Sequence, residues 1–201
     1  MTIAYPVKKG LYLNITNRCP CDCAFCLRKN ADGVYGSDSL WLDHEPSFDE
    51  IIAALNKHNL ADFSEIVFCG YGEPTERIDI VCEVAKHIKD AYPSIPIRLN
   101  TNGLADLIHS KPTAHLLNNL IDTVSISLNT PNSAEYEALC RPKFGSCSWE
   151  AMIDFAKECT SHVPNVILSI VGEPITSPEK QEKCHSIAES IGAKLRIRPY
   201  E

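Results

Sequence analysis

Short apolar runs alternate along the chain with longer segments in which apolar residues recur every three or four positions. The runs have the length of buried strands and cover residues 10–15, 65–69, 95–99, 123–128, 165–171 and 195–198. Helical spacing follows in the intervening segments, as at Ile80, Val81, Val84, Ala85 and Ile88. The pattern predicts six strand–helix units, the last without its helix, in an α/β fold with a parallel sheet and right-handed crossovers. Spacing alone suits either a doubly wound sheet or an incomplete barrel.

Capping residues mark several helix ends. Ser47 followed by Glu50 is a capping box and opens a helix. Ser177 before Pro178 predicts the start of the last helix, and Gly192 predicts its end. Further helical segments are expected at 133–140 and 148–160, with a short one after residue 112.

Polar and conformationally special residues gather directly after the predicted strand ends. These segments are residues 19–26, 70–75, 100–103, 127–129, 172–174 and 198–200. The carboxyl ends of parallel strands meet at one edge of the sheet, where the active sites of such folds lie. Six segments in phase, one of them rich in cysteine, predict a single functional site at this edge.

Composition and charge narrow the class of protein. With 201 residues and 44% hydrophobic content, the chain suits one folded domain, which we place at 1–201. The net charge of −7 disfavours a nucleic-acid binder. We expect no signal peptide and no membrane span, because no N-terminal signal pattern and no apolar stretch of about 18 residues is present. Ten cysteines, four of them within residues 19–26, fit a metal site in a reducing cytoplasm better than disulfides.

Cys19, Cys23 and Cys26 form a C-x3-C-x2-C pattern. Thiolates are soft ligands that suit iron–sulfur clusters or zinc. Three thiolates can hold three irons of a cubane and leave the fourth iron open, as a catalytic metal site requires. A zinc ion would need a fourth ligand, for which Cys21 and His44 are candidates. A third reading is that these cysteines are incidental.

The pattern resembles the signature of the radical S-adenosylmethionine (SAM) superfamily, C-x3-C-x-aromatic-C after the first strand. The resemblance implies a partial (βα)6 TIM-like barrel of parallel strands, a [4Fe–4S] cluster on Cys19, Cys23 and Cys26, and bound SAM, with Phe25 beside the adenine. Further elements resemble SAM-binding segments of that family. They are Gly70-Tyr71-Gly72-Glu73-Pro74, whose backbone would receive the methionine amino group, then Thr101 with Asn102 on the third strand, and Ser127 with Asn129 on the fourth.

The resemblance also implies the chemistry. Reductive cleavage of SAM would give methionine and a 5′-deoxyadenosyl radical that abstracts hydrogen from an unidentified substrate, with an electron donor such as flavodoxin or ferredoxin. Among small single-cluster members, the chain is most similar to the TatD-associated radical SAM proteins. The likeness rests on residues 16–26, on Gly70–Thr75 and on Leu139–Gly145. No clear counterpart of the G-x-I-x-G-x-x-E element is found on the fifth strand.

Two other functions are consistent with the same residues. One is a zinc-binding structural or interaction protein, and the other is a catalytically silent protein that binds SAM and a cluster. Four side chains near the predicted edge are weaker candidates for binding, namely Arg141, Glu173, Arg198 and Tyr200. The cysteines outside the motif are interpreted as small core residues, namely Cys69, Cys82, Cys140, Cys147, Cys159 and Cys184.

Overall fold

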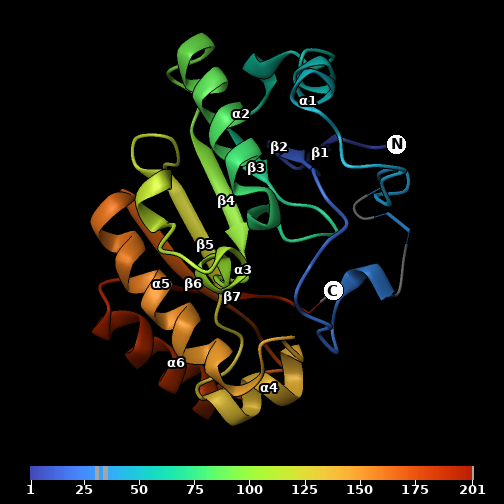
Figure 1. The fold of residues 1–201 in the computed structure, drawn as a ribbon. Helices are drawn as coiled ribbons and strands as arrows, with labels where there is room; N and C mark the ends of the chain where they lie inside the picture. The colour runs from blue at the N-terminus through green and yellow to red at the C-terminus, as the bar shows by residue number, and fades with distance from the viewer. Residues whose placement is uncertain (30–31, 34–35, 201) are drawn as a thin grey trace.

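A computed structural model describes residues 1–29, 32–33 and 36–200. Its strands form one sheet in which neighbours in space are also neighbours in sequence (Figure 1). They are β1 (Ala4–Val7), β2 (Gly10–Leu13), β3 (Glu65–Phe68), β4 (Ile97–Thr101), β5 (Thr123–Ser127), β6 (Asn165–Val171) and β7 (Lys194–Arg198). β1 pairs antiparallel with β2, whereas the strands from β2 to β7 are all parallel. The prediction of six parallel strands is therefore confirmed.

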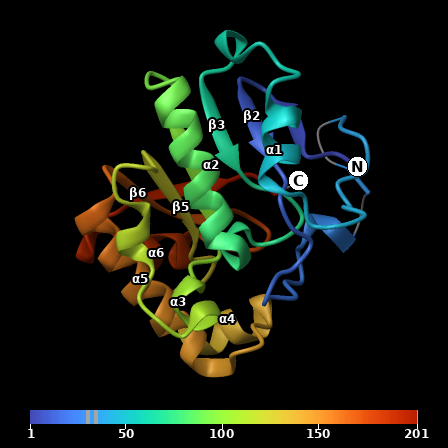
Figure 2. The same ribbon diagram turned by 45° about the horizontal axis from the view of Figure 1, so that its top comes forward.

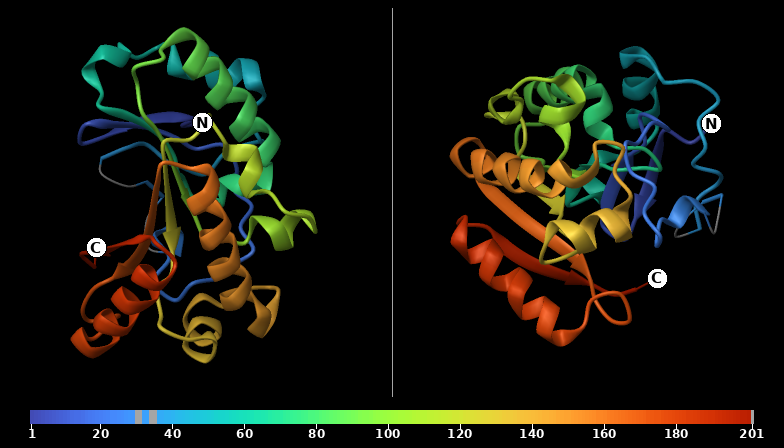
Figure 3. Two further views of the ribbon diagram at one scale, coloured as in Figure 1. Left: turned by 90° about the vertical axis from the view of Figure 1, so that its left-hand side faces the viewer. Right: turned by 60° about the horizontal axis from the view of Figure 1, so that its bottom comes forward.

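The helices lie along one face of the curved sheet (Figure 3). They are α1 (Phe48–Leu55), α2 (Ile78–Ala91), α3 (Ala105–His109), α4 (Ser133–Cys140), α5 (Ser148–His162) and α6 (Pro178–Ser190). The capping box at α1 is confirmed, since Ser47 Oγ accepts from the Glu50 amide and the Glu50 carboxylate accepts from the Ser47 amide. Gly192 follows α6 with a φ of +76°, as expected of a helix end. None of the helices in the described residues is long and apolar enough to cross a membrane.

Side-chain alternation gives the sheet an apolar face and a polar face. Leu11 and Leu13 of β2, with the equivalent positions of the other strands, pack into the main core under the helices. The residues between them point to the opposite, concave face, and they are mostly polar. Strand pairing sets Ser169 of β6 opposite Arg196 of β7 on that face. The concave face therefore offers side chains that can contact a polar ligand.

Some predicted elements differ from the structure. The antiparallel strand β1 is not among the predicted strands. It contains Pro6, which cannot donate to a sheet ladder and is tolerated because β1 is an edge strand. The third predicted strand, 95–99, lies two residues further along, since the strand begins after Pro96. The short helix expected after residue 112 is a 3-10 turn at Ala114–Leu117, and α3 before it was missed.

Candidate functional site

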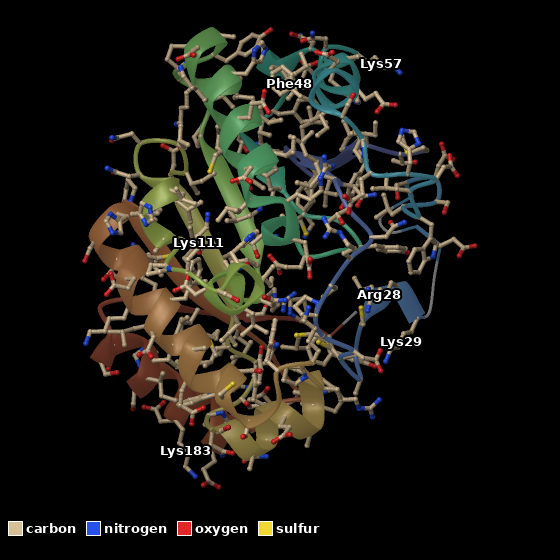
Figure 4. All side chains as sticks on the ribbon, in the orientation of Figure 1. Arg28, Lys29, Phe48, Lys57, Lys111 and Lys183 are labelled. Carbon is tan, nitrogen blue, oxygen red and sulfur yellow. The ribbon has the colours of Figure 1, made fainter. Side chains whose placement is uncertain are left out.

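The cysteine motif lies on the segment that follows β2. Cys21 is buried, whereas Cys19, Cys23 and Cys26 are partly exposed. The Cys26 amide donates to the Cys23 carbonyl at 3.2 Å, so the second half of the motif forms a tight turn. In Figure 4, sulfur atoms lie near the labelled Arg28, whose guanidinium donates to the Cys21 carbonyl at 3.0 Å. The three motif cysteines are therefore half-buried, whereas Cys21 lies inside.

A distant segment holds this loop in place. The end of α4 and the residues after it run beside the loop (Figure 2) and form an antiparallel bridge between Cys21 and Pro142. Their backbones exchange hydrogen bonds, from Ala24 N to the Leu139 carbonyl at 2.9 Å and from Lys143 N to the Pro20 carbonyl at 2.8 Å. The end of α4 and the three residues after it thus fix the cysteine loop through backbone hydrogen bonds and one isolated bridge.

Four thiols meet behind the loop. Cys21 lies within hydrogen-bonding reach of Cys19 and Cys23, and Cys140 of α4 lies within reach of Cys23. Hydrogen bonds from Cys140 and Cys21 lower the pKa of the Cys23 thiol to about 4, which favours the thiolate that ligates metals. Contact with Cys23 raises the pKa of Cys140. Cys140 is buried as predicted, but it belongs to the site as well as to the core.

The segment after β3 packs against the exit of β2. A side chain at Gly70 would overlap the Asn14 amide, and one at Gly72 would overlap the carbonyls of Thr16 and Arg18. The Glu73 amide donates to the Arg18 carbonyl at 2.8 Å. The close approach that requires these glycines is therefore made, in the first place, within the protein itself: to the Asn14 side chain at Gly70 and to backbone carbonyls at Gly72.

Glu73 joins this segment to β4. Its carboxylate is wholly buried and accepts hydrogen bonds from the amide and hydroxyl of Thr75 at 3.0 and 2.8 Å, the hydroxyl of Thr101 at 2.7 Å and the amide of Asn102 at 2.7 Å. Burial raises the pKa of Glu73, and these hydrogen bonds oppose the shift. Glu73 also caps the 3-10 turn that begins at Pro74. The side chains of Glu73 and Thr101 are thus occupied within the protein.

Asn102 connects β4 to the cysteine loop. Its side-chain amide nitrogen lies 4.0 Å from Cys19 Sγ and 3.8 Å from Cys21 Sγ, and its carbonyl oxygen accepts from the Leu104 amide at 2.9 Å. Three of the predicted segments, the cysteine loop, the residues after β3 and the end of β4, therefore form one connected network.

Asn129 connects β5 to the same thiols. It has a φ of +60°, and its amide nitrogen donates to Cys140 Sγ at 3.4 Å and approaches the Ser127 carbonyl at 3.5 Å. Its side-chain oxygen is buried and has no hydrogen-bond partner among the described residues. Burying an unpaired acceptor costs about 1–3 kcal/mol, and this one lies beside the Cys140 thiol, so the Asn129 oxygen is a candidate acceptor for a ligand donor.

Two aromatic candidates lie apart from these contacts. The buried ring of Tyr71 packs in a small cluster with Tyr5 and Leu40 and makes an edge contact with Trp41, the ring centroids lying 5.2 Å apart. Phe25 is half-buried and lines a cavity on the concave face. Tyr71 therefore supports the loop by packing, whereas Phe25 faces open space.

Several sequence interpretations need correction. His44 is not near the cysteines as a zinc ligand would be, because its Nε2 pairs with Glu50 Oε1 at 2.9 Å at the start of α1. Cys147 is exposed, not part of the core. Arg141 and Glu173 are exposed side chains, and Arg141 lies beside the cysteine loop, 3.7 Å from Asp22; a binding role for either stays a prediction.

The sequence interpretation missed one polar residue of the concave face. Arg98 is 8% exposed in the central strand β4 and donates to both carboxylate oxygens of Glu65, at 2.8 and 3.0 Å. It also donates to Tyr12 Oη and Asn100 Oδ1, at 3.2 Å each. The sequence did carry a signal for this residue, because Arg98 is a charged residue between Ile97 and Leu99 in a run that is otherwise typical of a buried strand.

The donor set suits an iron–sulfur cluster. Three partly exposed thiols on one loop are soft ligands, two of them, Cys19 and Cys23, have a lowered pKa, and the Asn102 amide lies beside the sulfurs. Within the described ranges, no group of three or more Cys, His, Asp or Glu side chains surrounds a single point as the shell of one metal ion would. The thiols of a cubane need not do so, because each binds a different iron.

Comparisons with known proteins agree with this architecture. A family model described as "Radical SAM superfamily" matches residues 13–184. A GTP 3',8-cyclase of Lactiplantibacillus plantarum is 28% identical over 159 residues, which are 79% of this chain and 44% of that protein. The chain thus spans less than half the length of this curated relative.

Solved structures of similar fold include a radical SAM methyltransferase from Sphaerobacter thermophilus and a structure described as native anSMEcpe with bound AdoMet. Their TM-scores are 0.67 and 0.61, and both are 15% identical to this chain. The alignments cover 98% and 94% of this chain and 57% and 50% of those chains. At this identity the likeness concerns the fold, and it bears out the predicted partial TIM-like barrel.

Proposed function

This chain belongs to the radical SAM superfamily, and from that premise we propose that it is a radical SAM enzyme that acts on a substrate not yet identified. A [4Fe–4S] cluster held by Cys19, Cys23 and Cys26 would, once reduced, supply the electron for cleavage of bound SAM to methionine and a 5′-deoxyadenosyl radical, which would take a hydrogen atom from the substrate. The observation that carries the proposal is the connected network in which the cysteine loop, Glu73 and Asn102 meet.

We assign the cluster ligands to Cys19, Cys23 and Cys26. Cys21 and Cys140 then support the cluster from behind as hydrogen-bonding thiols, because both are buried and both contact Cys23. Asn102 would donate toward the cluster sulfurs, which in such sites tunes the reduction potential. The protein therefore supplies three ligands and a polar second layer.

We assign SAM binding to the rim around the cluster. Backbone of Gly70 to Pro74 and the side chains of Phe25, Asn102, Ser127 and Asn129 would contact it, with the unpaired Asn129 oxygen as an acceptor for a ligand donor. Tyr71, Glu73 and Thr101 would act by holding this rim in shape, since their side chains are packed or hydrogen-bonded inside the protein. Their work is to orient the ligand and to exclude water.

Within the superfamily we place the chain with the TatD-associated proteins. The support is the Leu139–Gly145 stretch, which carried that likeness and which in this fold holds the cysteine loop. The reaction would need a one-electron donor such as a flavodoxin or a ferredoxin. We also propose that this protein is located in the cytoplasm, because a cluster with an open iron needs a reducing environment.

The test is the anaerobic reconstitution of the protein with iron and sulfide, followed by reduction, addition of SAM, and mass spectrometry of 5′-deoxyadenosine. We expect its formation to depend on the reductant and to be lost in Cys23→Ala. Cys147→Ser is the matched control, because Cys147 is an exposed thiol outside the cysteine loop that donates to the Phe144 carbonyl at 3.2 Å. It is expected to keep both iron and activity.

Other outcomes identify the alternatives. A protein that binds zinc and assembles no cluster would be the zinc-binding structural or interaction protein and would contradict the proposal. A protein that loads its cluster and binds SAM, yet yields no 5′-deoxyadenosine with any reductant, would be the catalytically silent binder. Iron and sulfide content, measured beside the activity, separates these two results.

A further inference from the structure

A cavity of about 350 Å³ opens on the concave face of the sheet. Its walls come from the turn between β1 and β2, from β4 and β7, and from the cysteine loop through Phe25. This volume lies within the range of small-molecule pockets, about 300–1,000 Å³. The cavity is therefore large enough for a compact substrate or for part of a larger one.

The cavity is strongly basic. Lys8, Lys9, Arg98, Arg196 and Arg198 line it, and Glu65 is the only acidic residue among the described residues that do. The whole chain carries a net charge of −7, so the cavity has the opposite sign to the protein around it. Charge of one sign concentrated on the walls of a cavity focuses its field and attracts the opposite charge.

Only part of this charge is neutralised by the protein. Arg98 is matched by the bidentate contact with Glu65. For Lys8, Lys9 and Arg196, by contrast, no ion pair is recorded in the described part of the chain. Among residues 1–29, 32–33 and 36–200, the fold thus lines one cavity with three cations that form no ion pair, although like charges repel each other.

The backbone fixes where these cations point. Lys8 and Lys9 are the two turn residues between β1 and β2, and Lys8 has a φ of +54°. Arg196 lies on β7 opposite Ser169, which sets its side chain on the concave face, whereas its neighbour Leu195 packs against the core. The basic lining thus follows from the turn and from strand alternation.

The cavity lies next to the proposed SAM site but does not coincide with it. Phe25 lines it, whereas Gly70–Pro74, Asn102 and Asn129 do not. Lys8 and Lys9 lie toward the amino ends of the strands and Phe25 toward the carboxyl ends. A molecule in the cavity would reach from the cysteine loop to the lysine turn.

We propose that this cavity binds the substrate through a phosphate-bearing group, held by Lys8, Lys9 and Arg196, with the reacting end of the substrate toward Phe25. The inference rests on the proposed function. Arginine matches the oxygens of a phosphate in a bidentate manner, and several cations in one cavity suit a group that carries several negative charges. A polyphosphate satisfies this better than a single carboxylate.

The test is isothermal titration of the cluster-loaded protein with inorganic tripolyphosphate, at near-physiological salt, and with citrate as a polycarboxylate of comparable charge. We expect saturable binding of tripolyphosphate at a single site, at least about tenfold tighter than that of citrate. Arg196→Gln and the double variant Lys8→Gln/Lys9→Gln should each weaken it by about tenfold or more, as expected from losing a charged hydrogen bond. Arg196→Lys should recover part of the loss.

Lys111→Gln is the matched control, because Lys111 is an exposed lysine after α3 that does not line the cavity (Figure 4). Circular dichroism of each variant verifies folding. Absence of saturable binding, an equal loss in Lys111→Gln, or citrate binding as tight as tripolyphosphate would overturn the inference. Tripolyphosphate binding that follows the predicted variants in a protein that never yields 5′-deoxyadenosine would uphold the cavity and refute the proposed function instead.

Discussion

The hydrogen bonds of Glu73 offer a quantitative test of how the site is held together. The carboxylate satisfies four donors, and it is wholly buried. Two of the donors are hydroxyls, on Thr75 and Thr101, which can rotate toward other acceptors. The other two are backbone amides, of Thr75 and Asn102, and these cannot turn away. The cost of removing Glu73 is therefore set mainly by the two amides.

Each buried donor left unpaired costs about 1–3 kcal/mol, so the two stranded amides of Glu73→Ala should lower the free energy of unfolding by about 2–6 kcal/mol. Glu73→Gln keeps the oxygen that faces three donors and turns its amino group toward Asn102. It thus loses one hydrogen bond and should cost about 1–3 kcal/mol. The loss of stability in Glu73→Gln should lie at the lower end of this range, because the substitution also removes a charge whose burial is unfavourable.

The assay is equilibrium unfolding of the cluster-free protein in guanidinium chloride, followed by far-ultraviolet circular dichroism. Glu83→Gln and Glu83→Ala are the matched controls, since Glu83 is an exposed carboxylate on α2, and they should stay within about 0.5 kcal/mol of wild type. A Glu73→Ala protein as stable as the Glu83 variants would refute the reasoning, because it would mean that the stranded amides find water or another acceptor at no cost.

Three further predictions follow from contacts at the same edge of the sheet. Gly72→Ala should cost about 1–3 kcal/mol or more in the same unfolding assay, because its new methyl group meets the Arg18 carbonyl; an unchanged midpoint would contradict the packing. Cys140→Ala should retain the iron that Cys23→Ala loses, measured by metal analysis after reconstitution, because Cys140 supports a ligand and is not one; equal loss would make it a ligand. Glu45 has a pKa that burial raises but that hydrogen bonds, above all from Arg18, bring below its usual 4.5. The stability that ionised Glu45 contributes is therefore present above pH 4.5 and is lost as the pH falls through its lower pKa in the folded protein. Glu45→Gln should reduce the acid-dependent fall in the free energy of unfolding by less than about 1 kcal/mol, because Arg18 is exposed. An unchanged dependence on acid pH would contradict a stabilising Glu45–Arg18 contact.

The sequence predicted the elements that local chemistry determines. Alternation of apolar runs with helical spacing gave the six parallel strands, and the Ser47–Glu50 pair gave the start of α1. It did not give β1, whose pairing with β2 depends on an edge position that only the assembled sheet creates. Nor did it give the contact between Cys140 and Cys23, because no pattern in either segment signals a partner more than a hundred positions away.

The motif residues show why a site can be located from sequence more easily than its roles can be assigned. Glu73 stands in a segment that resembles a SAM-binding element, yet its carboxylate is spent on Thr75, Thr101 and Asn102. A motif can be recognised in the sequence because its segment must adopt one backbone conformation. Internal hydrogen bonds stabilise that conformation as much as ligand contacts do. Asn129 is the opposite case, since its buried oxygen has no partner among the described residues. Glu73, which is fully satisfied within the protein, therefore positions the site, whereas the Asn129 oxygen beside Cys140 is the acceptor that we propose for the ligand.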